Sequence, residues 1–247
     1  MIEIKSKEEI EKLRLAGKVL SKIVSELKSR VKPGIRTQEV DAWAEDLIKK
    51  NGALAAFKGY RGFPANVCVS VNEEVVHGIP NERKVEEGDI VGIDIGIALD
   101  GFFSDTAFTL NIGKVSSQKQ KLVEATRKAL ELGIAKAKIN NHLSDISAAI
   151  QKFVEAQGFS VVRDFVGHGI GRRMHEEPEI PNFGLAGQGP LLKAGMVLAI
   201  EPMVNTGSWE VEILSNGWTA VTRDRKPSAH FEHTVAITEN GTEVLTK

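Results

Sequence analysis

The chain has 247 residues, of which 42% are hydrophobic and 26% charged, and these proportions exclude a disordered or fibrous protein. Its 32 Lys and Arg residues stand against 33 Asp and Glu residues, so the formal charge of -1 favours binding neither to DNA nor to a membrane surface. The single cysteine, Cys68, excludes an intrachain disulfide, and the charged N-terminus lacks the apolar stretch of a secretory signal. No apolar run approaches the ~20 residues of a membrane span. We therefore expect a cytoplasmic protein.

Two amphipathic helices are predicted at the start of the chain. Apolar residues recur at spacings of three and four from Ser6 to Val31, and Ser6 with Glu9 has the pattern of a capping box. Pro33-Gly34 ends this helix, and a second helical pattern runs from about Thr37 to Asn51. Each pattern has one apolar face, which predicts that the helices cover a core.

A β-hairpin is the clearest element that follows. The valine-rich stretch from Val67 to Val76 predicts a strand with interruptions. After it, Asp89 to Leu99 and Phe102 to Asn111 are apolar, β-prone runs joined at Asp100-Gly101, a dipeptide that suits a tight turn because both central residues need a positive φ. We expect these two runs to pair directly.

The second half of the chain repeats the order of the first. Helices are predicted from Ser117, capped with Gln120, to about Lys138 and from Leu143 to about Gln157, and strands and long loops follow from Phe159. Residues 88–94 resemble 195–201, and residues 103–106 resemble 231–234. We interpret this as an internal duplication within a single α/β domain, with halves of about 1–115 and 116–247 around a pseudo-twofold axis. Chance similarity of two apolar strands is the alternative.

Asp94 is the first residue that suggests chemistry, because it lies inside the apolar run Val91–Ile97, where an unpaired carboxylate is costly to bury. A turn centred on Asp100-Gly101 places Asp94 opposite Ala107, so that Asp105 is its diagonal neighbour on the same face. Two carboxylates this close cannot both stay ionised without a cation. The pair is either a metal site or two ordinary aspartates near strand ends.

Three further residues extend the pattern. Glu201 and Glu232 lie at the ends of other apolar runs, so that the two halves of the duplication contribute two acids each, and His168 lies in a glycine-rich segment. Four carboxylates balance the charge of two divalent cations, which two-metal hydrolytic sites hold through bridging carboxylates. Oxygen ligands with one nitrogen suit Mn²⁺, Fe²⁺, Co²⁺ or Zn²⁺.

Competing catalytic motifs do not fit. Gly167–Gly171 lacks the glycine spacing of a dinucleotide-binding loop, and no Lys-Ser/Thr follows to form a phosphate loop. His175 has Glu179, not a second histidine, four residues later, so the helical zinc-protease signature is absent. Cys68 lies in an apolar run, which is more typical of a buried thiol than of a nucleophile.

The ordered set of motifs resembles type I methionine aminopeptidase across nearly the whole chain. The segments that carry the resemblance are Phe63–Cys68, Ser70–Pro80, Asp94 to Asp105, Gly167–Gly171, His175–Pro178, Glu201-Pro202 and Phe231–Thr234. The resemblance implies a duplicated "pita-bread" α/β fold with two divalent metal ions. The positions that match the family's metal ligands are Asp94, Asp105, His168, Glu201 and Glu232, with Asp105 and Glu232 as the bridging ligands.

The resemblance also implies roles for residues around the metals. His77 would flank the bound peptide, His175 would hydrogen-bond the scissile carbonyl oxygen, and Glu201 would take and return a proton. The methionine pocket would be lined by Tyr60, Phe63, Cys68 and Trp218. Three residues depart from the family pattern, namely Phe57, Met174 and His230. We expect structural roles for His142 and His233.

The implied function is removal of the initiator methionine from new polypeptides whose second residue is small, by a cytoplasmic, monomeric enzyme with a possible ribosome contact. Three alternatives remain. A proline-specific peptidase of the same fold would carry an extra N-terminal domain, for which the early helices leave no room. The type II enzyme would need a helical insertion between Glu201 and Glu232. A peptide- or ribosome-binding module would have lost metal ligands, and this chain has all five.

Overall fold

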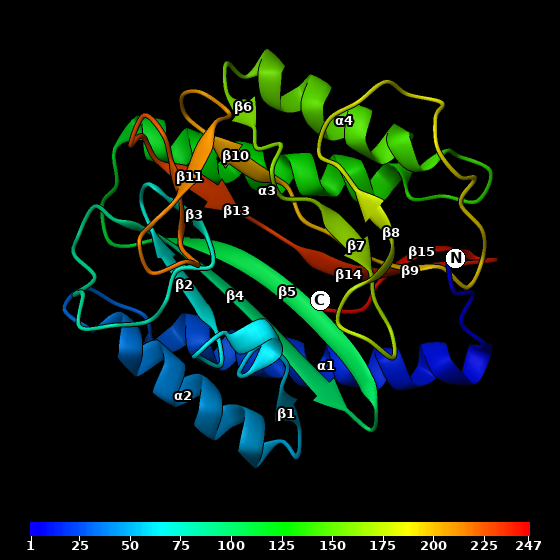
Figure 1. The fold of residues 1–247 in the computed structure, drawn as a ribbon, viewed down its shortest axis with the longest axis horizontal. Coiled ribbons are helices and arrows are strands. Elements are labelled where there is room, and N and C mark those ends of the chain that lie inside the picture. Colours follow the sequence, from blue (N-terminus) through cyan, green and yellow to red (C-terminus); the bar gives the residue numbers. More distant parts are fainter.

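Two pairs of helices enclose the strands of the molecule, with α1 and α2 on one side and α3 and α4 on the other (Figure 1). This computed structural model describes residues 1–247. The helices span Lys7–Arg30 (α1), Thr37–Lys50 (α2), Ser117–Lys136 (α3) and Leu143–Ala156 (α4), and a 3₁₀ turn, η1, covers Tyr60–Gly62. None of the helices combines the length and the apolar character that crossing a membrane requires.

The predicted helices are confirmed, and one predicted cap is wrong. Ser6 caps α1, accepting from the Glu9 N–H while the Glu9 carboxylate accepts from the Ser6 N–H, as the capping box requires. The cap of α3 is Ser116, not Ser117, because Ser116 has the extended backbone and accepts from the Lys119 N–H. A Ser-Ser pair offers the same side chain twice, and only the backbone conformation distinguishes the two.

The strands form four sheets in which every pairing is antiparallel. The first sheet joins β1, β4 and β2 with β5 on β4, the largest has the order β15-β14-β9-β7-β8, and two small sheets have the orders β13-β10-β6 and β11-β12-β3. The strands are β1 Leu54–Ala55, β2 Cys68–Val71, β3 Glu74–Val76, β4 Ile90–Leu99, β5 Phe102–Asn111, β6 Ser160–Val161, β7 Gly167–Gly169, β8 Glu176–Ile180, β9 Val197–Ile200, β10 Met203–Asn205, β11 Val211–Ile213, β12 Ala220–Thr222, β13 Ser228–His230, β14 His233–Thr238 and β15 Gly241–Val244.

The hairpin of β4 and β5 has the predicted register. Asp94 pairs with Ala107 and Gly96 with Asp105, so Asp105 is the diagonal neighbour of Asp94. Asp100 and Gly101 form the turn with φ of 50° and 79°, the left-handed conformation that this dipeptide tolerates. The predicted strand from Val67 to Val76 divides into β2 and β3.

Each helix pair packs on its own part of the core. Apolar faces of α1 and α2 cover β2 and β4, and those of α3 and α4 cover β9 and β14. This arrangement agrees with the expected pita-bread fold class.

Two threonines tie β5 to β14 where the two parts of the core meet. The Thr106 hydroxyl donates to the Glu232 carbonyl at 2.7 Å, and the Thr234 hydroxyl donates to the Asp105 carbonyl at 2.8 Å. The Glu232 N–H also donates to the Ala107 carbonyl at 2.9 Å. These reciprocal bonds hold the backbones of Asp105 and Glu232 side by side, although 126 residues separate Thr106 from Glu232 in the chain.

Candidate metal centre and peptide pocket

The five predicted metal ligands line one cavity of about 160 Å³. Each comes from a different strand or strand end, namely Asp94 from β4, Asp105 from β5, His168 from β7, Glu201 directly after β9 and Glu232 directly before β14. The convergence follows from the two sheets meeting at β5 and β14, since both sheets direct acids into the junction.

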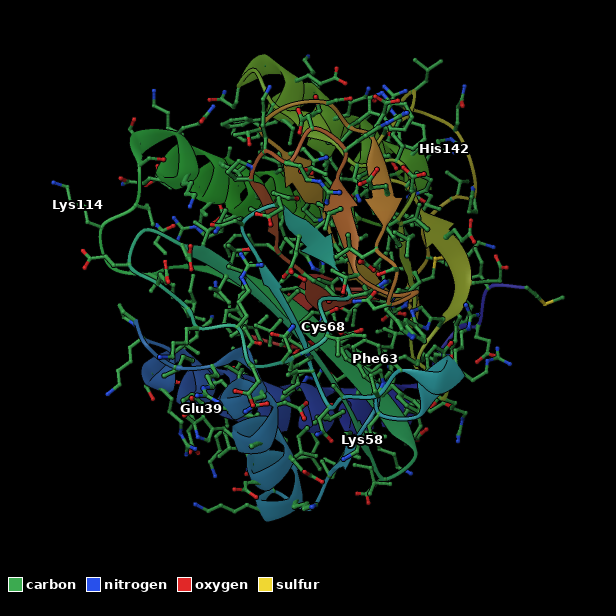
Figure 2. The ribbon with its side chains drawn as sticks, turned by 60° about the vertical axis from the view of Figure 1, so that its left-hand side comes forward. Glu39, Lys58, Phe63, Cys68, Lys114 and His142 are labelled. Carbon is green, nitrogen blue, oxygen red and sulfur yellow. The ribbon has the colours of Figure 1, made fainter.

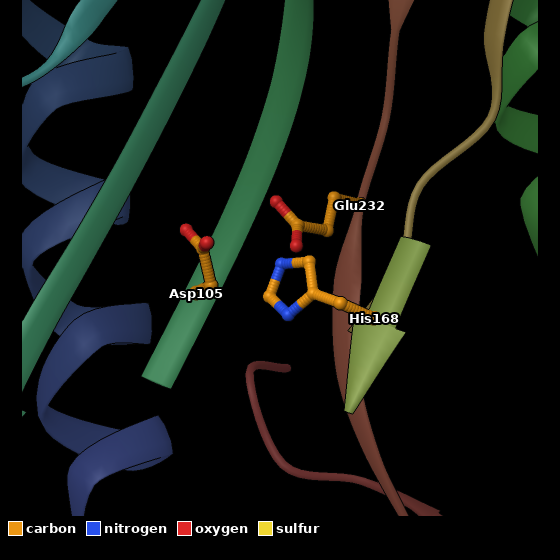
Figure 3. Close-up of side chains that lie close together, drawn as sticks. All are labelled: Asp105, His168 and Glu232. Carbon is orange, nitrogen blue, oxygen red and sulfur yellow. The ribbon is translucent and has the colours of Figure 1, made fainter. Parts of the chain in front are cut away.

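Asp105, His168 and Glu232 form the tightest group. One ligand atom from each lies within 4.8 Å of the others, all three residues are buried, and their side chains point toward one another (Figure 3). Glu201 adjoins this group, with its Oε1 atom 3.6 Å from His168 Nε2. Two atoms that each bind the same ion at ~2.1 Å are separated by about this distance, so Glu201 Oε1 and His168 Nε2 are placed to share a metal ion.

The tautomer of His168 follows from its one hydrogen bond. Its Nδ1 lies 2.9 Å from the Gly169 carbonyl oxygen, which can only accept, so Nδ1 carries the proton. The Nε2 lone pair is then free and faces the carboxylates. Burial also lowers the pKa of His168 to about 3, which keeps the imidazole neutral at neutral pH. This neutral ring with a free Nε2 is the form in which histidine binds metals.

The carboxylates of the cavity are close together, and a bound cation would offset the cost of keeping them ionised. Burial raises the pKa of Asp94, Asp105, Glu201 and Glu232, and neighbouring carboxylates raise it further for Asp94, Glu201 and Glu232. Buried oxygens of Asp94, Asp105 and Glu232 also have no hydrogen-bond donor in the protein. Because buried polar atoms are normally satisfied, these residues fit divalent cations.

His175 lies at the cavity beside His168, with 4.2 Å between the ring centroids. Its Nδ1 is 2.9 Å from the Tyr60 hydroxyl, and the two rings stack. Burial, followed by the nearby Arg61 guanidinium, lowers the pKa of His175. A neutral ring whose Nδ1 accepts from the Tyr60 hydroxyl has its proton on Nε2, the form that can donate to a substrate.

His77 also lines the cavity, directly after β3, and its backbone has a φ of 58°. Its ring meets Phe165 edge to face at 5.2 Å and lies 6.5 Å from the Trp218 ring. Burial lowers the pKa of His77 to about 4, so the ring is neutral at neutral pH.

An apolar wall completes the cavity. It consists of the four predicted pocket residues together with the two that depart from the family pattern, namely Phe57, Tyr60, Phe63, Cys68, Met174 and Trp218. Phe63 meets Trp218 edge to face at 5.2 Å. Burial raises the pKa of the Cys68 thiol well above its usual value, which agrees with a packing role and not a nucleophilic one. Phe63 and Cys68 lie near the middle of the molecule in Figure 2.

Three other histidines lie outside the cavity lining. His142 is the N-cap residue of α4 and lies at the periphery of Figure 2, and His233 makes its Nδ1 contact with the Thr246 hydroxyl. Both positions agree with the expected structural roles. The Nε2 atom of His230 lies 3.6 Å from Glu201 Oε2 and has no hydrogen-bond partner in the protein.

Arg61 is a cavity residue that the sequence patterns did not indicate. It lines the rim beside Tyr60, with its guanidinium carbon 5.5 Å from the Tyr60 ring centroid and a φ of 50°. The glycines at 59 and 62 predict a loop there, but the direction of a loop side chain depends on the tertiary structure.

Comparisons with known proteins identify the family to which the chain is similar. The model of metallopeptidase family M24 matches residues 11–239. Methionine aminopeptidase of Clostridium perfringens is 55% identical over 246 residues, which cover 100% of this chain and 99% of that protein. The crystal structure of methionine aminopeptidase from Thermotoga maritima superposes with a TM-score of 0.98 at 48% identity and covers both chains completely. Prolidase from Pyrococcus furiosus has a TM-score of 0.81 at 27% identity, but the match covers 99% of this chain and 65% of that one.

The family model spans most of the chain, and the relatives match it from end to end with the pita-bread fold. The chain therefore belongs to metallopeptidase family M24.

Proposed function

We propose that this protein is a metal-dependent aminopeptidase that hydrolytically removes the N-terminal methionine from peptides and nascent proteins. The observation that carries the proposal is the convergence of four carboxylates, two of them buried and two half-buried, and a neutral imidazole beside an apolar pocket. The relatives that match along their whole length are named methionine aminopeptidases, which supports the same activity.

Five residues of the cavity would hold two divalent ions, namely Asp94, Asp105, His168, Glu201 and Glu232, and Asp105 and Glu232 would be the ligands that both ions share. The free Nε2 of His168 and the unpartnered oxygens of Asp105 and Glu232 support this assignment. The donor set suits Mn²⁺, Fe²⁺, Co²⁺ or Zn²⁺. When bound, such ions polarise the scissile carbonyl and lower the pKa of a water molecule.

The protein's own residues supply the remaining steps. Glu201 accepts a proton from the attacking water and returns it to the leaving amine. His175 Nε2–H donates to the carbonyl oxygen as negative charge develops there, while the Tyr60 hydroxyl holds the ring through Nδ1. His77, neutral at neutral pH, flanks the peptide without adding a charge to the site.

The side chain of the first substrate residue binds in the pocket that the apolar wall lines. Aromatic rings and the sulfur atoms of Cys68 and Met174 suit a thioether side chain, which is polarizable and flexible. A charged side chain would be buried there without a partner. We extend the proposal to a small second residue in the substrate, because the chain must leave the cavity directly beyond the methionine.

We also propose a cytoplasmic monomer whose partners are peptides and nascent chains, with the two halves at about 1–115 and 116–247. The single cysteine and the near-zero net charge support an intracellular protein that acts on peptides instead of DNA or a membrane. A ribosome contact belongs to the same proposal.

The test is hydrolysis of Met-Gly-type peptides after chelation and after metal re-addition, with Ala-Pro dipeptides as competitors. We expect activity on Met-Gly to vanish with chelation and to return with metal, and Ala-Pro to be left intact. Cleavage of Ala-Pro in preference to Met-Gly would identify a proline-specific peptidase. Metal binding without any turnover would identify a binding module.

A further inference from the structure

A loop without regular hydrogen bonding carries His175 into the site. Residues 171–175 form a series of bends between β7 and β8. The backbone hydrogen bonds of the loop involve Gly171, which accepts from the Phe103 N–H and donates to the Arg173 carbonyl, so the direction of His175 also depends on side-chain contacts. Met174 packs into the apolar wall of the cavity, and the buried ionic contact beside the loop comes from the first residues of the chain.

Lys5 makes the central contact. Its Nζ lies 2.6 Å from Glu176 Oε2, and the two side chains are only 3% and 2% exposed. Glu176 directly follows His175, and its other carboxylate oxygen accepts from the Arg173 N–H at 3.0 Å. One carboxylate therefore joins the N-terminal segment to the backbone two residues before His175.

Further contacts hold the same two segments together. The Lys5 N–H donates to the Gly195 carbonyl at 2.8 Å, which fixes the segment itself. Glu3 accepts from Arg173 at 2.7 Å and Glu9 from Arg172 at 3.0 Å, at the surface of the protein. These exposed pairs are individually weak, whereas Lys5 and Glu176 are shielded from solvent.

The packing at Gly171 leaves little room for any other arrangement. A Cβ atom at this position would overlap Lys5 Cε and lie 3.0 Å from Glu176 Oε1. The Phe103 N–H donates to the Gly171 carbonyl at 2.8 Å, which ties the loop to β5 close to Asp105. Lys5 thus fills the space beneath the loop as well as neutralising Glu176.

We propose that Lys5 is a positioning residue for His175. Its ion pair with Glu176 holds loop 171–175 so that the His175 ring stays against Tyr60 and His168. This inference rests on the proposed function, in which His175 donates to the carbonyl oxygen. Misplacement of a catalytic group by ~1 Å can cost about 10²-fold in rate, so a small loop shift is sufficient for a large effect.

The first experiment compares Lys5→Met, Lys5→Arg and Arg14→Met in the metal-loaded protein. Arg14 provides the matched control, because it joins the N-terminal helix to Glu243 through an ion pair remote from the loop. We expect Lys5→Met to lower kcat by about 10–100-fold with KM within about twofold, and Lys5→Arg to recover most of the loss. Arg14→Met is expected to keep kcat. Wild-type kcat in folded Lys5→Met would overturn the proposal.

A cycle with His175→Ala separates positioning from a general structural effect. If Lys5 acts through His175, Lys5→Met lowers kcat less than about twofold when His175 is already alanine. The same 10–100-fold loss on both backgrounds would overturn the proposal.

Lys5→Met leaves the Glu176 carboxylate buried without a cation, so this variant can fail to fold. A second variant covers that case. Glu176→Gln removes the charge and keeps an oxygen that can accept from the Arg173 N–H. We expect it to reproduce the loss of kcat.

Histidine NMR tests the placement without any turnover. In the metal-free protein, the His175 Cε1–H resonance, assigned with His175→Ala, should move in Lys5→Met or Glu176→Gln and not in Arg14→Met. An unmoved resonance in both of the first two variants would overturn the positioning role. If the wild-type protein cleaves no Met-Gly peptide, the proposed function fails instead, and the resonance still reports on the ion pair.

Discussion

The ring of His77 provides a quantitative prediction for the pH dependence of stability. Burial, followed by repulsion from His175, lowers the pKa of His77 from 6.5 to about 4 in the folded protein. Between these values the unfolded chain binds a proton at this residue and the folded protein does not. The resulting penalty on folding is absent above pH 6.5, grows as the pH falls and is complete below about pH 4.

The size of the penalty follows from the two pKa values. For a fully buried ring, linkage gives a loss of ~2 kcal/mol between pH 7.5 and pH 5. Part of the ring surface faces the cavity, so we expect about 1–2 kcal/mol after solvent screening. His77→Asn removes the titrating group. Between pH 7.5 and pH 5, the free energy of unfolding of this variant should therefore fall by about 1–2 kcal/mol less than that of the wild-type protein.

The assay is urea unfolding of the metal-free protein in chelator at pH 7.5 and pH 5. Other titrating groups contribute to both proteins, and the difference between wild type and His77→Asn isolates His77. His142→Asn, at the N-cap of α4, controls for loss of a histidine outside the cavity, since asparagine is itself a good cap. Equal losses of stability in wild type and His77→Asn would refute the reasoning.

Four further predictions concern the active site. Asp105→Asn and Glu232→Gln should each nearly abolish turnover while circular dichroism shows an intact fold, and wild-type rates in either would remove the dinuclear assignment. His175→Ala should lower kcat by about 10²–10³-fold on a Met-Gly-type peptide, whereas a change confined to KM would make it a ground-state contact. Trp218→Ala opens one wall of the pocket, so the preference for methionine over leucine or norleucine should shift, since one methylene in such a pocket is worth ~1–3 kcal/mol. Rejection of a first-position lysine should persist. Equal cleavage of Lys-Gly and Met-Gly peptides by the wild-type protein would contradict the assignment of the methionine pocket. His230→Gln keeps a polar side chain beside Glu201 and should retain activity, whereas His230→Phe should lower kcat by about 10-fold or more, and equal rates in the two variants would exclude a role for a polar group at this position.

Local signals in the sequence predicted the elements that local physics controls. The capping box of Ser6 and Glu9 depends on four consecutive residues, and the structure has it as predicted. The hairpin register followed from the Asp100-Gly101 turn, since a two-residue turn and the two-residue side-chain period leave one pairing. The diagonal relation of Asp94 to Asp105 was therefore predictable without any tertiary information.

The composition of the site was also predictable, because acids inside apolar strands need a compensating partner. The proximity of the acids from the two halves of the chain was not predictable from the sequence. The bonds of Thr106 and Thr234 that place Asp105 beside Glu232 join residues more than a hundred positions apart. The duplicated sequence pattern suggested this meeting, but the distances come from the packing of two sheets.

Loop side chains depended most on the tertiary structure. Arg61 reaches the rim of the cavity from a left-handed backbone position, and Lys5 reaches Glu176 across a separation of 171 residues. Neither residue has a periodic pattern or a motif partner nearby in the chain. Short-range patterns were sufficient to predict the helices, the hairpin and the acids that need a cation, since these depend on local geometry and on the cost of burying charge. The tertiary structure alone decided which histidine nitrogen is free and what holds the His175 loop, because those depend on contacts between segments that only the folded chain brings together.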